Sequence, residues 1–147
     1  MDKVELRVAG KLTMLQQKSS LLARGFALAC SLILAASLVF ADGVRKKVRF
    51  AKGGTSASIK GAVIRGERDR YIVGASGGQR MTVSITSLEK NAVFQIYLAG
   101  EGETLDGAGE GDDATRWSGT LPANSDYVIV VGGTRGNASY TLKITVK

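Results

Sequence analysis

Three short stretches of this chain alternate strictly between apolar and polar residues. They are residues 81–86, where Met81, Val83 and Ile85 are apolar, and residues 94–98 and 140–147. A repeat of two places the apolar side chains on one face of an extended chain and the polar ones on the other. Antiparallel strands that pack one face on a core have this pattern, so each stretch is predicted to be such a strand.

Five further stretches fit strands less regularly: residues 44–50, 57–63, 71–75, 115–121 and 127–131. In the first, Val48 and Phe50 are expected to point inward. Its basic residues are typical of an edge strand protected against aggregation. Residues 127–131 are apolar on both faces, which predicts a central strand.

Turn-forming residues separate the predicted strands. Groups containing Gly, Asn or Pro stand at residues 52–54, 66–67, 76–78, 122–124 and 132–137. No stretch beyond residue 42 has a helical repeat. Eight short strands at this spacing predict an all-β domain over residues 42–147, folded as an antiparallel two-sheet sandwich or jelly roll.

The first 41 residues have a different character. Residues 25–41 form an uncharged run of 17 residues that follows Lys18 and Arg24 and ends in Val39-Phe40-Ala41. This is the pattern of a secretory signal peptide cleaved after Ala41, with translation starting at Met1 or at Met14. The run is at the short end for a membrane span, so a permanent anchor is the disfavoured alternative. We therefore expect residues 42–147 to be periplasmic or secreted.

Charge and residue types exclude several function classes. The net charge is +7, and removing residues 1–41 leaves 15 basic and 11 acidic residues, a modest excess that does not call for nucleic acid. The chain has no histidine, and its single cysteine, Cys30, lies in the predicted signal peptide. Catalysis by a histidine base or a thiol is thereby excluded, and zinc or haem sites are disfavoured. We expect no enzyme, no cofactor and no metal, although a carboxylate pair stays formally open.

The most unusual segment is the glycine-rich run EGETLDGAGEGDD over residues 101–113. It carries six carboxylates: Glu101, Glu103, Asp106, Glu110, Asp112 and Asp113. Three interpretations are open, namely a calcium site, contact with a cationic protein partner, and a solvated mobile loop. The spacing does not match an EF-hand loop, so calcium has the weakest support.

Basic and aromatic residues add a few candidates. Basic residues group at residues 45–49 and again at Arg65, Arg68 and Arg70. The guanidinium groups of the second group can bind carboxylates or stay solvated. Trp117 is predicted to lie in the core. Tyr97 falls on the strand face opposite Phe94, so it is the better candidate for a surface contact.

The chain resembles the family of periplasmic inhibitors of g-type lysozyme, and also the bacterial pre-peptidase C-terminal β-sandwich domains. The resemblance rests on Val48-Arg49-Phe50-Ala51-Lys52-Gly53, Ser56-Ala57, Gly61, Gly66, Tyr71, Gly78-Gln79, Gly119-Thr120-Leu121-Pro122-Ala123, Asp126-Tyr127, Thr134-Arg135 and Tyr140-Thr141-Leu142-Lys143-Ile144. It covers essentially all of residues 42–147. Most of these positions are turn glycines and apolar core residues, which report on fold more than on function.

The resemblance implies a binding protein that occupies the groove of a cell-wall hydrolase, either a g-type lysozyme or a related enzyme. The inhibitors carry a Ser-Arg pair in the loop that corresponds to residues 101–113, where this chain has acidic residues and glycine. The residues expected to contact a partner are the six carboxylates, Arg116, Arg135 and Tyr97. The alternative is an envelope sandwich that binds glycan or serves as an accessory domain.

Overall fold

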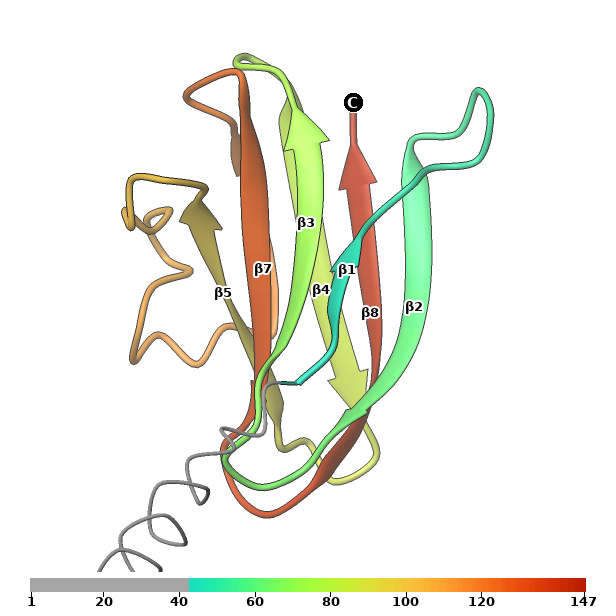
Figure 1. The fold of residues 1–147 in the computed structure, drawn as a ribbon, viewed down its shortest axis with the longest axis vertical. Helices are drawn as coiled ribbons and strands as arrows, with labels where there is room; N and C mark the ends of the chain where they lie inside the picture. Colours follow the sequence, from blue (N-terminus) through green and yellow to red (C-terminus); the bar gives the residue numbers. More distant parts are fainter. Residues whose placement is uncertain (1–42) are drawn as a thin grey trace, which may run out of the picture. The chain divides into compact units, whose positions relative to one another are not determined.

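A computed structural model of the chain describes residues 43–147. The predicted signal peptide and its cleavage site lie outside these residues. The described part consists of eight strands without a helix, which confirms the all-β prediction (Figure 1): β1 Arg45–Lys47, β2 Ser56–Val63, β3 Asp69–Ala75, β4 Arg80–Ser87, β5 Ala92–Leu98, β6 Arg116–Thr120, β7 Ser125–Gly133 and β8 Ala138–Val146. A search of this part for a helix able to cross a membrane finds none.

The strands form two four-stranded sheets that face each other as a sandwich (Figure 1). The first sheet has the order β1-β3-β7-β5 and the second β2-β8-β4-β6. Residues 127–131 lie in β7, which has a strand on each side, so their predicted central position is confirmed. The basic first strand, β1, is at the edge of its sheet, as predicted. One pairing differs from an antiparallel sandwich, because β1 runs parallel to β3. The chain crosses to β2 in the second sheet and returns, so β3 runs in the direction of β1.

Inward-facing residues of both sheets make one apolar core. The inward sides of β4, β5 and β8 are the apolar ones that the alternation predicts. Each fully buried aliphatic side chain contributes about 1.5–3 kcal/mol relative to an exposed one. Phe50 and Trp117 are only partly buried and pack against this core from its margin, so Trp117 is less enclosed than predicted.

A buried polar network joins the two sheets inside the core. Asp69 on β3 is 2% exposed, and its carboxylate accepts hydrogen bonds from the Tyr140 hydroxyl on β8 at 2.5 Å and from the Val44 backbone N–H at 2.7 Å. The Tyr140 and Tyr71 hydroxyl oxygens are 2.6 Å apart. Burial is the main cause that raises the pKa of both tyrosines, so both hydroxyls are protonated at neutral pH. The network therefore satisfies a carboxylate that would be costly to bury alone.

Gly61 on β2 makes room for this network. A Cβ atom at that position would lie 2.4 Å from the Tyr140 hydroxyl oxygen, well inside van der Waals contact. The resemblance to known families includes Gly61, Tyr71 and Tyr140, and the structure gives these positions a common physical role.

Candidate functional site

The acidic loop between β5 and β6, residues 99–115, is attached along the open edge of β5. Three backbone N–H groups of β5 donate to backbone carbonyl oxygens of the loop, each at 2.9 Å. The pairs are Leu98 with Glu103, Ile96 with Ala108 and Phe94 with Ala114. Leu105, Ala108 and Ala114 are buried. The loop therefore covers an edge strand that would otherwise expose unpaired backbone groups, and it differs from a loop held only at its ends.

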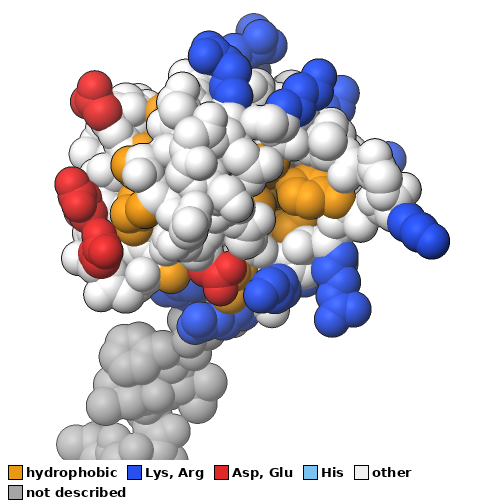
Figure 2. All heavy atoms as spheres, turned by 90° about the horizontal axis from the view of Figure 1, so that it is seen from above, with side chains coloured by type: hydrophobic (Ala, Val, Ile, Leu, Met, Phe, Trp, Pro, Cys, Tyr) orange, Lys and Arg blue, Asp and Glu red, His pale blue; other side chains and the backbone are white. Residues whose placement is uncertain are grey.

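Trp117 holds the middle of the acidic loop. Its indole Nε1–H donates to the Asp106 carbonyl at 2.9 Å, and its ring occupies the space where Gly119 lacks a side chain. The Asp112 carboxylate accepts from the Gly109 backbone N–H at 2.7 Å. All six carboxylates are exposed. Seen from the upper end of Figure 1, most of the visible acidic side chains lie at one side, and the basic ones lie around the rest of the outline (Figure 2).

The exposed carboxylates do not converge on a common point. Within residues 43–147, no three Asp, Glu, His or Cys side chains are placed so that they could hold a metal ion. We predict that millimolar calcium leaves the melting temperature unchanged. A site filled at 100 times its dissociation constant would add about 2.7 kcal/mol, which thermal unfolding would detect easily. A shift that disappears in Asp112→Ala would contradict this prediction.

One end of the sandwich carries a fully exposed leucine on a well-fixed turn. Leu88 follows β4 and is 98% exposed. The Ser87 hydroxyl accepts hydrogen bonds from the backbone N–H groups of Asn91 at 2.9 Å and Ala92 at 3.1 Å. Lys90 has a left-handed φ of 52°, which closes the turn. An apolar side chain is thus held out into solvent by a turn with little freedom.

The neighbouring loop between β7 and β8 is fastened to the same turn. Asn91 is 2% exposed, and its amide donates to the carbonyls of Arg135 at 3.0 Å and Asn137 at 2.9 Å. The Arg135 guanidinium donates to the Glu89 carbonyl at 3.0 Å. We call these two segments, residues 87–91 and 134–137, the turn end. Its ordered backbone and its exposed apolar tip make the turn end a candidate binding surface.

A hollow of about 390 Å³ adjoins the turn end. Its lining includes Leu88, Asn137 and Ile64, and Ile64 is itself 59% exposed. The Arg65 backbone N–H donates to the Asn137 side chain at 2.9 Å, so the turn between β2 and β3 belongs to the same end. Sequence reasoning missed Leu88, Ile64 and Asn91. A leucine inside the otherwise polar run Ser87-Leu88-Glu89-Lys90-Asn91 was the available signal.

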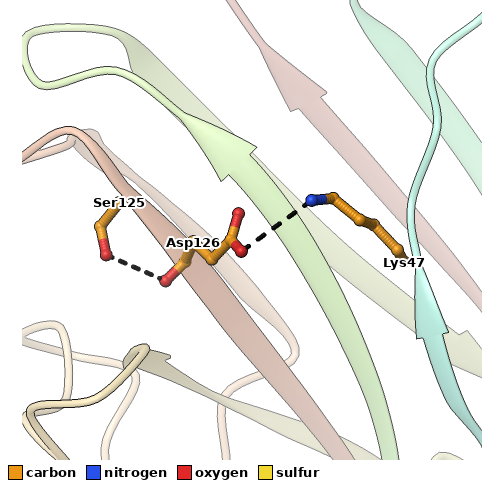
Figure 3. Close-up of polar contacts among 3 residues, drawn as sticks. All are labelled: Lys47, Ser125 and Asp126. Atoms are coloured by element: carbon orange, nitrogen blue, oxygen red, sulfur yellow. Dashed lines mark hydrogen bonds and ion pairs between the residues drawn. The ribbon is translucent and has the colours of Figure 1, made fainter.

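The outer face of the first sheet carries a second hollow, the sheet groove, of about 590 Å³. Tyr97 and Glu110 line it together with Arg45, Arg68 and Arg70. Tyr97 is half-buried, and its hydroxyl donates to the Gln95 side chain at 2.7 Å. Nearby on this face, Lys47 of β1 and Asp126 of β7 form an ion pair at 4.0 Å (Figure 3). Such an exposed pair adds at most about 1 kcal/mol.

The residues expected to contact a partner are therefore distributed over three places. The six carboxylates and Arg116 belong to the acidic loop and its exit into β6, Arg135 lies at the turn end, and Tyr97 lies in the sheet groove with Glu110. The pairing of Ala114 with Phe94, close to the start of β5, places the last part of the acidic loop toward the turn end. Of the arginine group at residues 65–70, Arg68 and Arg70 reach the groove.

Solved structures similar to this chain include two lysozyme inhibitors and one pre-peptidase C-terminal domain. PliG of Aeromonas hydrophila, a periplasmic lysozyme inhibitor of g-type lysozyme, is 31% identical, with a TM-score of 0.63 over 73% of this chain and 100% of that chain. PliG of Salmonella Typhimurium, with the same description, is 27% identical, with a TM-score of 0.58 over 71% and 99%.

The third similar structure is the pre-peptidase C-terminal domain of a Bacillus anthracis collagenase. It is 16% identical, with a TM-score of 0.50 over 70% of this chain and 94% of that chain, a likeness of fold alone. A scan of protein-family models and a search of curated proteins found no match. The structural similarities confirm both resemblances noted in the sequence.

Proposed function

Because this chain belongs to the family of periplasmic inhibitors of g-type lysozyme, we propose that it inhibits a lysozyme of that type in the periplasm. The observation that carries this proposal is the similarity to the Aeromonas hydrophila inhibitor, which extends over the whole of that protein. The residue inventory supports it, since residues 42–147 contain neither histidine nor cysteine and so lack the commonest groups for turnover.

The proposed contact is insertion of the turn end into the groove of the enzyme. Leu88 would supply an apolar anchor, and Arg135 a guanidinium beside it. Glycosidases commonly act through a pair of carboxylates, and a guanidinium fork matches a carboxylate in shape and charge. Within residues 43–147 the Arg135 guanidinium makes one hydrogen bond, to the Glu89 carbonyl, which leaves other N–H groups for a partner. A turn that is already ordered loses little entropy on binding.

The acidic loop has a separate proposed role in bringing the two proteins together. Its six carboxylates belong to one loop and are all exposed. They would attract a basic hydrolase over a distance of about 10 Å at moderate salt, and added salt would screen that attraction. The loop thus favours a cationic partner, and a cell-wall hydrolase other than a g-type lysozyme is the alternative target.

We predict that the purified protein slows wall lysis by a g-type lysozyme more than lysis by a c-type lysozyme. The assay follows the turbidity of wall substrate with increasing inhibitor at low and high salt. Inhibition should weaken at high salt because the steering by the acidic loop is screened. Absence of inhibition with several g-type enzymes at micromolar protein would contradict the proposed function. Inhibition of a different wall hydrolase would select the alternative target.

A further inference from the structure

The sheet groove has a composition that lysozyme inhibition does not require. Its floor is formed by Val128 and Val130 of the central strand β7. Arg45, Arg68 and Arg70 stand on one side, while Tyr97, Gln95 and Glu110 stand on the other. Three arginines and one carboxylate thus lie on opposite sides of an apolar strip on the outer face of a sheet.

Strand register explains why a hollow forms here. Arg45, Arg70, Val130 and Gln95 occupy one row across the four strands, and Ile72, Val128 and Tyr97 occupy the next. The short valines lie in the middle of the sheet and the longer side chains toward its edges. The attached acidic loop raises the far wall with Gly100, Gly102 and Glu110. The groove therefore results from side-chain length along each row and from the loop beside β5.

Gly132 makes room for the Arg68 side chain. A Cβ atom on Gly132 would lie 2.6 Å from a terminal nitrogen of the Arg68 guanidinium, so the side chain lies against the bare backbone of β7. The fold thereby brings a third guanidinium to the groove at a defined position. Guanidinium groups so placed bind planar anions through paired hydrogen bonds.

We propose that the sheet groove binds a saccharide that carries a carboxylate. The arginine side takes the carboxylate, and the half-buried ring of Tyr97 provides a flat surface for a sugar ring. Glu110 on the opposite wall accepts hydrogen bonds from sugar hydroxyls or amides, and its charge disfavours a ligand that is anionic along its whole length. The volume of about 590 Å³ is that of ordinary ligand sites.

The test uses the purified protein and three probes, with binding measured by titration calorimetry. The probes are the disaccharide of N-acetylglucosamine and N-acetylmuramic acid, which bears a carboxylate, the neutral N-acetylglucosamine dimer, and inorganic phosphate. We expect the acidic disaccharide to bind at least about tenfold more tightly than the neutral one. The neutral disaccharide lacks the carboxylate, and one charged hydrogen bond contributes enough free energy for this factor. Phosphate alone is expected to bind more weakly than the acidic disaccharide.

Two variants locate the site. Arg68→Gln is expected to weaken binding of the acidic disaccharide about tenfold, and Gly132→Ala to weaken it by moving Arg68 without removing its charge. Lys143→Gln, on the outer face of the second sheet, makes the same charge change elsewhere and should have no effect. The proposal would be overturned by equal affinity for the two disaccharides, or by phosphate binding as tightly as the acidic disaccharide. It would also be overturned if Arg68→Gln bound the acidic disaccharide as tightly as the unaltered protein does. None of these outcomes depends on lysozyme inhibition.

Discussion

Replacing Tyr140 by phenylalanine is expected to lower the free energy of unfolding by about 1–3 kcal/mol. The substitution removes a hydroxyl that donates to the Asp69 carboxylate, which remains buried at 2% exposure. Val44 still donates to one oxygen of this carboxylate, but the other oxygen loses its partner, and leaving a buried polar atom unpaired has a cost of this size. For a domain of this length, each kcal/mol lowers the melting temperature by about 4 °C or more. Thermal unfolding of both proteins at neutral pH measures the difference.

The same network predicts how stability depends on pH. The pKa of Tyr140 and that of Tyr71 are raised above the ordinary value of 10.0, chiefly by burial. Above about pH 10 the unfolded chain therefore releases protons that the folded state retains. Stability is fully present below that pH and is lost progressively as the pH rises above it. Tyr140→Phe removes one of the two groups, so its stability should fall less between about pH 8 and about pH 11.

Tyr97→Phe is the matched control for the loss of stability expected in Tyr140→Phe. It also removes a tyrosine hydroxyl, but one that is half-buried on the outer face and bonded to Gln95 rather than to a buried carboxylate. Its melting temperature should stay close to that of the unaltered protein. Equal loss of stability in the two variants would show that the hydrogen bond from Tyr140 to Asp69 contributes no more than an exposed one.

Introducing negative charge at the turn end is expected to weaken lysozyme inhibition about 30-fold in Arg135→Glu, and similarly in Leu88→Asp. Both side chains are exposed, so neither change removes core packing. Residues that anchor an interface typically contribute about 2 kcal/mol or more, which corresponds to this factor. The inhibition constant for a g-type lysozyme measures the effect, with the melting temperature as a check on folding.

Lys143→Glu on the outer face of β8 is the control for charge reversal. It changes the net charge as Arg135→Glu does, but away from the turn end, so inhibition should change little. Neutralising Asp112 and Asp113 should mainly slow association and reduce its salt dependence. If Arg135→Glu and Leu88→Asp inhibit as well as the unaltered protein, another surface makes the contact.

The sequence by itself determined the class of fold and most strand positions. Alternation in residues 81–86, 94–98 and 140–147 fixes which side chains are buried, because a strand exposes every second residue to the same face. The sequence also determined that β7 is a central strand, through its two apolar faces, and that β1 is an edge strand, through its basic residues. The resemblance carried by turn glycines, Tyr71 and Tyr140 identified the family, since these positions depend on the fold.

Only the tertiary structure decided where the candidate sites lie. The parallel pairing of β1 with β3 depends on the path of the chain between sheets, which no local pattern encodes. The burial of Asp69 has no sign in the sequence, because Asp69 stands in the charged run Glu67-Arg68-Asp69-Arg70 and its partner Tyr140 lies 71 residues away. Arg45, Arg68 and Tyr97 meet at one groove through strand register and through the room that Gly132 leaves for Arg68. Such long-range contacts follow from pairing across the sheets, and so they are absent from any single stretch of sequence.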